Sequence, residues 1–172
     1  MPHTFASHVR REALTNGITN AVFNGLIAWW LVRHRDSIPV WGGEGLAVDF
    51  IATAIILVFI VSLIVMPMTR RKVASGVLPT TVWQTGTTRS VLEFMARRHL
   101  AVCALLLGLL SAVLFVPPTL LLTEALSISA LSAEQFAMVK ALWAGVVAAV
   151  MVVAMISIVA VAKSNEVAGD QL

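Results

Sequence analysis

Four stretches of this chain are almost wholly apolar, and each approaches the length that an α-helix needs to cross a lipid bilayer, about 20 residues. They cover residues 13–32, 48–66, 100–116 and 141–162. Inside a bilayer the backbone N–H and C=O groups find no water, so such segments fold as helices that satisfy these groups internally. The composition agrees, because 59% of the 172 residues are hydrophobic and only 12% are charged. We therefore predict an all-α integral membrane protein in which four transmembrane helices form one bundle, a single domain over residues 1–172.

Prolines and a capping motif indicate where the helices end and begin. Pro67 follows the second segment, and Pro117 and Pro118 follow the third. Because proline lacks an N–H group and clashes with the preceding turn, we expect the helices to end there. Ser132 and Gln135 have the spacing of a capping box, in which each side chain accepts a hydrogen bond from the other residue's backbone N–H. The last helix is therefore expected to begin near Ser132, ahead of its apolar segment.

Two connecting segments have the periodicity of amphipathic helices. In residues 89–98 charged residues recur every four positions, and in residues 119–131 hydroxyl-bearing residues do so. Helices of this kind lie at a membrane surface with the apolar face in lipid. We expect a short interfacial helix at each place. The first has two interpretations, a solvated extension of the third membrane helix or a specific site for a lipid or partner.

The distribution of basic residues predicts the orientation. Of the 12 Lys and Arg residues, nine lie in the N-terminal segment, the central loop and the C-terminal tail, and three lie in the other two loops. Because basic residues accumulate on the cytoplasmic side, this predicts a multi-pass protein of the bacterial inner membrane with both termini in the cytoplasm. The clusters of basic residues are thus explained by the topology of the protein in the lipid bilayer, which we expect to be its partner. We expect no nucleic acid as a partner. Four tryptophans would lie near the outer interface: Trp29, Trp30, Trp41 and Trp143.

Small residues recur every four positions in three of the apolar segments. The positions are Gly17, Ala21 and Gly25 in the first segment, Ala104, Gly108 and Ala112 in the third, and Ala141, Gly145 and Ala149 in the fourth. Such stripes let helix backbones approach closely in lipid, where the hydrophobic effect no longer drives helices together. We predict that these residues are helix-packing positions.

Three asparagines form a polar stripe on the first apolar segment. Asn16, Asn20 and Asn24 are four residues apart, which places them on one face of a helix. An amide near the middle of a bilayer has no water to bond, so this face must turn toward protein or an aqueous cavity. In one interpretation the asparagines form hydrogen bonds to another helix or to a second copy, and each bond stabilises the protein by about 0.6 kcal/mol on average. In the other interpretation they line a polar pathway. Because this segment alone has a polar stripe beside a small-residue stripe, we expect it at the centre of the bundle.

Charged residues extend the stripe toward both membrane surfaces. Glu12 lies one turn before Asn16 at the inner end, and Asp49 and Lys140 lie near the outer ends of the second and fourth segments. We expect Asp49 to pair with Lys140, or with an arginine after the first segment, as a structural contact rather than a proton relay. Glu12, the three asparagines, Asp49 and Lys140 would together form a polar track across the bilayer.

The motifs of several chemistries are not found in the sequence. His3, His8, His34 and His99 lie at the ends of the apolar segments or outside them, so no pair is placed to hold a haem between membrane helices. His99 and Cys103 share a helix face, but no second pair supplies the remaining ligands of a zinc or copper site. The sequence also has no serine elbow, catalytic carboxylate pair or histidine-based dyad. We therefore expect no enzyme activity, no cofactor and no metal.

Residues 20–30, NAVFNGLIAWW, and residues 66–72, MPMTRRK, resemble segments of small, uncharacterised bacterial inner-membrane proteins. The resemblance covers the first two apolar segments and implies no activity.

Two functions of different classes fit these observations. A permease or channel-type protein would use the asparagine stripe as one wall of a pathway, and because four helices seldom enclose a pathway alone, this predicts a homo-oligomer. A non-catalytic accessory or assembly subunit would instead dock onto a larger membrane complex through its small-residue faces. A lipid or quinone bound between the helices is a third possibility.

Overall fold

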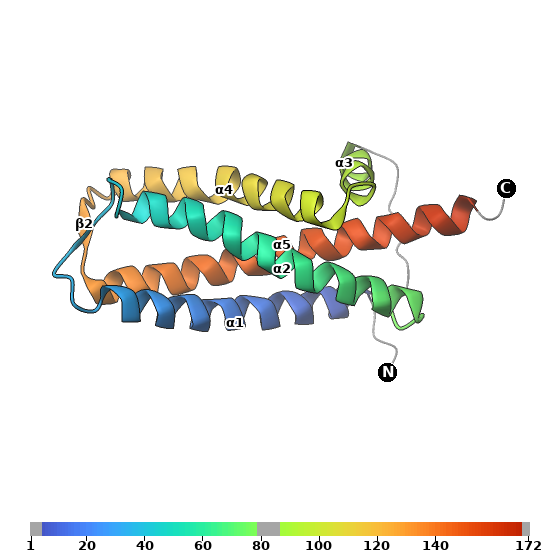
Figure 1. Ribbon diagram of the computed structural model, residues 1–172, viewed down its shortest axis with the longest axis horizontal. Coiled ribbons are helices and arrows are strands. Elements are labelled where there is room, and N and C mark those ends of the chain that lie inside the picture. Colours follow the sequence, from blue (N-terminus) through green and yellow to red (C-terminus); the bar gives the residue numbers. More distant parts are fainter. Residues whose placement is uncertain (1–4, 79–86, 170–172) are drawn as a thin grey trace.

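The protein is almost entirely helical. The computed structural model describes residues 5–78 and 87–169. The elements in these ranges are α1 (Phe5–Val32), β1 (Ile38–Pro39), α2 (Leu46–Ala74), α3 (Thr87–Ala96), α4 (Leu100–Ala125), β2 (Ala130–Leu131) and α5 (Ala133–Gly169). The helices α1, α2, α4 and α5 run along the long axis of the molecule, and α3 lies across it (Figure 1). The all-α prediction is confirmed.

Three of the described helices have the length and composition of membrane spans. These are α2, α4 and α5, which contain the second, third and fourth apolar segments. α1 has 28 residues and is long enough, but its asparagines and other polar residues make it less apolar than these three. The structure therefore identifies three apolar helices that can cross a membrane.

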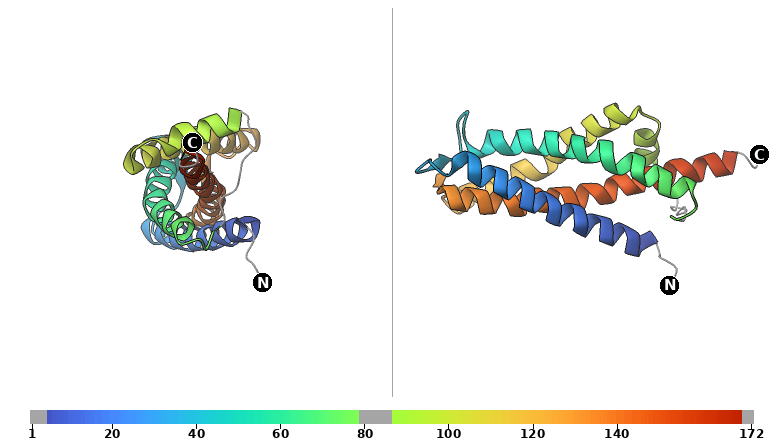
Figure 2. Two further views of the ribbon diagram at one scale, coloured as in Figure 1. Left: turned by 90° about the vertical axis from the view of Figure 1, so that its right-hand side faces the viewer. Right: turned by 60° about the horizontal axis from the view of Figure 1, so that its bottom comes forward.

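α5 occupies the centre of the bundle. It packs against α1, α2 and α3, whereas α1 packs mainly against α5, and α4 mainly against α2. Seen from the end that carries both termini, α5 lies on the inner side of the arc formed by α1, α2 and α4 (Figure 2). Only Gly17, Ala28 and Val32 are buried along α1. The expectation that the first segment is central is wrong, because its apolar side chains are mostly exposed and the more uniformly apolar α5 is surrounded instead.

A short two-stranded ribbon ties together the two loops at the far end from the termini. β1 and β2 pair antiparallel, with Ile38 opposite Leu131, and the N–H of Val40 donates to the carbonyl of Ser129 at 2.9 Å. Ile38, Val40 and Leu131 are buried beneath this ribbon. Two backbone segments more than ninety residues apart in sequence thus hold together the ends of α1, α2, α4 and α5 that lie away from the termini.

Two predicted helix ends are wrong. α2 continues through Pro67 to Ala74, and α4 continues through Pro117 and Pro118 to Ala125. A proline removes only its own N–H, and a helix in a membrane protein tolerates this where packing holds the segment beyond it. Thr123 is buried beyond the two prolines of α4. The separate outer helix expected at 119–131 is therefore the last part of α4, followed by a turn and β2.

The predicted start of the last helix is confirmed. The backbone N–H of Ser132 donates to Oε1 of Gln135 at 3.0 Å, and the N–H of Gln135 donates to Oγ of Ser132 at 3.2 Å. This reciprocal pair is the capping box. It satisfies two free N–H groups directly before α5.

The amphipathic segment at 89–98 forms a helix of its own. α3 ends at Ala96, and α4 begins at Leu100 in a different direction (Figure 1). Leu92, Met95 and Ala96 pack against the core of the bundle. The interpretation of this segment as an extension of the third membrane helix is wrong, because the chain turns at Arg97–His99 and lays the apolar face of α3 on α5.

One tryptophan has a more buried environment than expected. The ring of Trp143 stacks on Phe50, with centroids 4.4 Å apart, and its Nε1–H donates to Oγ1 of Thr119 at 2.9 Å. Its N–H is therefore satisfied by protein rather than by interfacial water. The other three tryptophans predicted near the outer interface, Trp29, Trp30 and Trp41, are exposed.

Candidate functional site

The small-residue stripes decide how α1 sits on α5. A Cβ atom on Gly17 would lie 3.1 Å from the Cβ of Ala149, and one on Gly25 would lie 2.7 Å from the Cβ of Ala141. A Cβ on Gly145 would lie 3.0 Å from the Cβ of Ala21. The first and fourth stripes therefore face one another along two antiparallel helices, and the contact is too close for larger residues.

The third stripe faces α2 instead. A Cβ on Gly108 would lie 2.8 Å from the backbone oxygen of Ile55. Ser111, on the same side of α4, has its Oγ 3.1 Å from the carbonyl oxygen of Ala54. Ala104 is fully buried in this contact region, and Ala112 packs against the part of the core that lies near the β-ribbon. The close approach of α4 to α2 thus matches the approach of α1 to α5.

This packing leaves an open groove between α1 and α2. The groove has a volume of about 430 Å³. Its polar lining consists of Asn20 and Asn24 from α1 and Asp49 and Thr53 from α2. The remaining lining residues are apolar: Ile27, Ala52, Ile56, Leu57, Ile60 and Val61. Two of the three asparagines therefore face α2 across a space that no described part of the chain fills.

The asparagine amides bond to their own helix. The Nδ2 atoms of Asn16, Asn20 and Asn24 donate to the backbone oxygens of Glu12, Asn16 and Asn20, each at 2.9 Å. Because only the nitrogen of an amide can donate to a carbonyl, these bonds fix which way each amide points. The side-chain oxygens have no hydrogen-bond partner among the described residues. Cross-helix bonds from this stripe, one of the two interpretations, do not occur within the described chain.

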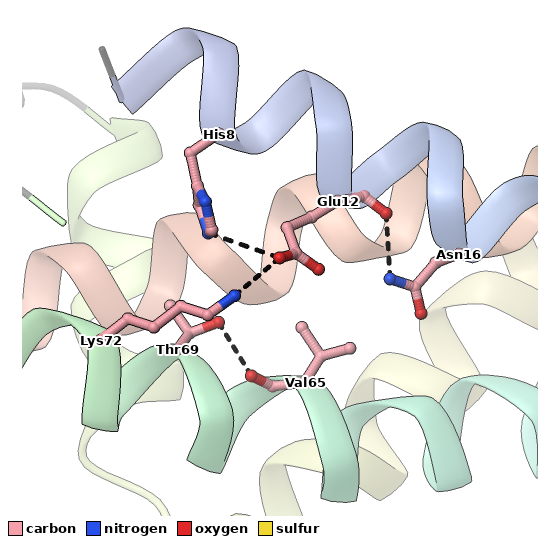
Figure 3. Close-up of polar contacts among 6 residues, drawn as sticks. All are labelled: His8, Glu12, Asn16, Val65, Thr69 and Lys72. Carbon is pink, nitrogen blue, oxygen red and sulfur yellow. Dashed lines mark hydrogen bonds and ion pairs between the residues drawn. The ribbon is translucent and has the colours of Figure 1, made fainter. Parts of the chain in front are cut away.

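The end of the asparagine face nearest the N-terminus carries an ion pair between α1 and α2. The Nζ of Lys72 donates to Oε1 of Glu12 at 2.7 Å, and Nε2 of His8 lies 3.9 Å from the same oxygen (Figure 3). Glu12 directly follows Arg10 and Arg11 in the sequence, but its hydrogen-bond partner Lys72 lies 60 residues away, in the basic run that ends α2.

The pKa of Glu12 reflects this contact. Burial alone would raise the pKa of the carboxyl group, but the hydrogen bond and the charge of Lys72 act against it, and His8 and Arg11 add smaller effects. The net result is a pKa below the usual value of 4.5. Glu12 is therefore ionised at neutral pH, and the ion pair is a charged one.

The end of the groove nearest the β-ribbon carries a second ion pair. The Nζ of Lys140 donates to Oδ1 of Asp49 at 2.6 Å, and the Lys140 side chain is only 8% exposed. Arg35, another expected partner, pairs with Glu44 at 2.9 Å instead. The second carboxylate oxygen of Asp49, Oδ2, is buried and has no hydrogen-bond partner in the described ranges.

The predicted polar residues thus occupy one continuous side of the molecule. Asn20, Asn24 and Asp49 line the groove, Asn16 and Glu12 continue the same face of α1 toward its N-terminus, and Lys140 approaches from α5 at the β-ribbon end. Thr53 was not among the predicted residues, although it lies one turn after Asp49 on the same helix face. The groove offers the amide oxygens as hydrogen-bond acceptors, and the second amide N–H groups and the Thr53 hydroxyl as donors.

Comparison with known proteins found no matching protein family, no matching curated protein and no matching solved structure. Within residues 5–78 and 87–169, no group of three His, Cys, Asp or Glu side chains is placed to hold a metal ion.

Proposed function

We propose that this chain is a subunit of a permease or channel-type homo-oligomer in a bacterial inner membrane, and that α1 is its fourth membrane-crossing helix. α1 lies along the apolar α5 at a distance set by glycine and alanine contacts. Large apolar side chains cover the outward side of α1, among them Leu14, Ile18, Val22 and Leu26, each more than half exposed. A helix packed beside α5 with such a surface is suited to lipid on that side.

The observation that carries the proposal is the open groove between α1 and α2. In a single copy the free oxygens of Asn20 and Asn24 border a space that is open on one side. Leaving polar groups without partners in lipid is costly. A second copy placed over the groove would shield these atoms from lipid and convert the open groove into an enclosed polar pathway.

The lining also favours a class of solute. Each asparagine amide uses one N–H on the helix backbone, which leaves its oxygen and its second N–H for a ligand, and the hydroxyl of Thr53 can donate or accept. Lys140 and Lys72 sit at the two ends, each committed to a carboxylate. A small uncharged solute that both donates and accepts hydrogen bonds fits this lining better than an ion.

The experiment is solute flux into liposomes that contain the purified protein. Asn20→Leu together with Asn24→Leu should abolish flux while the oligomer stays assembled. Thr15→Leu together with Thr19→Leu is the matched control, because both threonines are exposed polar residues of α1 outside the groove. Flux that survives the asparagine change, in an intact oligomer, removes the pathway from consideration.

A second candidate function is an accessory or assembly subunit of a larger membrane complex. The observation in its favour is that the groove is lined mainly by isoleucine and other apolar residues, with acceptor oxygens at its edge. A foreign helix with hydrogen-bond donors would satisfy both features. Mild extraction followed by native mass spectrometry separates the two functions: a stoichiometric foreign chain that is lost on the Asn20→Leu and Asn24→Leu changes supports the accessory role, and a self-contained oligomer supports transport.

A further inference from the structure

A second cavity lies at the opposite end of the molecule from the β-ribbon. It has a volume of about 600 Å³ and lies between the end of α2, the junction of α3 and α4, and α5. Figure 1 shows α2 and α4 diverging toward this end, with α5 between them. The cavity does not overlap the groove between α1 and α2, since the two share no lining residue.

Basic residues surround the cavity. Arg70 comes from α2, and Arg97, Arg98 and His99 come from the turn between α3 and α4. Among the side chains that the structure describes, those of residues 5–78 and 89–162, none of the three arginines forms an ion pair with a carboxylate. Three guanidinium groups around one concavity create a positive potential and offer paired N–H donors for an oxyanion.

The start of α4 adds to this potential. Leu100, the first residue of the 26-residue helix α4, lines the cavity, and the helix has no side-chain cap at its N-terminus. Free backbone N–H groups and the helix dipole favour an anion at such a position. Arg98, one of the three arginines of the cavity, has its guanidinium carbon 4.4 Å from the centre of the Phe94 ring. This cation–π contact restricts the conformations of the Arg98 side chain.

The remaining walls of the cavity are apolar. They are formed by Val73, Ala74, Ala96, Leu100, Val159 and Ala162. α3, the amphipathic helix beside the cavity, exposes Val91 and Phe94. A free inorganic ion would gain nothing from these surfaces, whereas the glycerol and first acyl carbons of a lipid would.

We propose that this cavity binds the phosphate-bearing headgroup of an anionic phospholipid in the leaflet at this end of the protein. The three arginines contact the phosphate, and the apolar walls contact the glycerol and upper acyl chain. The cavity lies at the end that the basic residues predict to be cytoplasmic, where basic pockets between membrane helices bind anionic headgroups. The site is independent of the pathway between α1 and α2.

The test uses the full-length protein in mild detergent, incubated with phosphatidylglycerol and phosphatidylcholine of identical acyl chains. Native mass spectrometry then counts the lipids that each variant retains. The wild type should retain phosphatidylglycerol in preference to phosphatidylcholine. Combined Arg70→Gln, Arg97→Gln and Arg98→Gln should lower phosphatidylglycerol retention by about a hundredfold, because each of the three basic residues near an anionic headgroup contributes about fivefold.

The matched control is Arg71→Gln, which removes an exposed arginine next to Arg70 that does not line the cavity. It should change retention by less than about twofold. Replacing the same three cavity arginines by lysine keeps the charge and should preserve the preference for phosphatidylglycerol. Equal retention of phosphatidylglycerol by the triple glutamine variant and by Arg71→Gln would overturn the proposal. Displacement of the lipid by excess inorganic phosphate would show that the site binds free phosphate and not a lipid headgroup.

Discussion

The contact between α2 and α4 allows a quantitative prediction for Gly108→Ala. The new Cβ would lie 2.8 Å from the backbone oxygen of Ile55, whereas ordinary van der Waals contact begins at 3.4 Å. Backbone atoms cannot rotate aside as a flexible side chain would, so the two helices must separate by about 0.6 Å. Overpacking of this kind costs about 1–3 kcal/mol.

The same separation affects a neighbouring hydrogen bond. Oγ of Ser111 lies 3.1 Å from the carbonyl oxygen of Ala54, and a further 0.6 Å or so takes it beyond hydrogen-bonding distance. The hydroxyl of Ser111 keeps its shorter bond to the carbonyl of Gly108 at 2.7 Å, so losing the longer contact adds at most about 0.5 kcal/mol. Alanine is the better helix former by about 1 kcal/mol, which offsets part of the loss. The net expectation is that Gly108→Ala lowers the free energy of unfolding by about 0.5–2.5 kcal/mol.

The assay is equilibrium unfolding in mixed micelles, followed by the loss of helical circular dichroism. Gly43→Ala is the control, because a Cβ on Gly43 meets nothing within 4 Å. If Gly108→Ala proves as stable as Gly43→Ala, the close approach of α2 to α4 described above is incorrect.

The remaining predictions concern the two ion pairs. A double-mutant cycle of Lys140→Met and Asp49→Asn, measured by unfolding in micelles, should give a coupling energy of about 1–2 kcal/mol. This value is smaller than that of a fully buried pair because Asp49 is partly exposed. A coupling energy near zero would show that the 2.6 Å contact does not stabilise the fold. Because the pKa of Glu12 is lower in the folded protein than its usual 4.5, the pair with Lys72 stabilises the protein above that pH and is lost as the pH falls through and below it. The unfolding free energy of the wild type should therefore drop more steeply on acidification than that of Glu12→Gln, and parallel pH profiles would contradict this assignment.

The helices and the small-residue faces follow from local patterns in the sequence. Length and apolar composition locate α2, α4 and α5, and the spacing of Ser132 and Gln135 locates the start of α5 to within one residue. Four-residue periodicity also identifies which side of α1 carries glycine and which side carries asparagine. Each of these features depends only on residues within a few helical turns of one another, so it can be predicted from the local sequence.

What the sequence does not reveal is the choice of partners. A stripe of small residues predicts that another helix packs closely against it, but it does not identify that helix. The pairing of α1 with α5 and the central position of α5 were therefore not predictable. The same holds for the ion pair between Glu12 and Lys72. Pro117 and Pro118 misled for a related reason, because tertiary contacts beyond them, the hydrogen bond from Trp143 to Thr119 and the burial of Thr123, hold the next turns in place against the local tendency to end the helix.

The central claim is that the groove between α1 and α2 contains water in the assembled protein. Its most direct test is labelling of single cysteines by a membrane-impermeant thiol reagent, in a background where the buried Cys103 is replaced by alanine. Asn24→Cys, which lines the groove, should react readily, and Val22→Cys, on the exposed apolar side of α1, should not. Equal and negligible labelling at both positions would contradict an aqueous groove and, with it, the polar pathway.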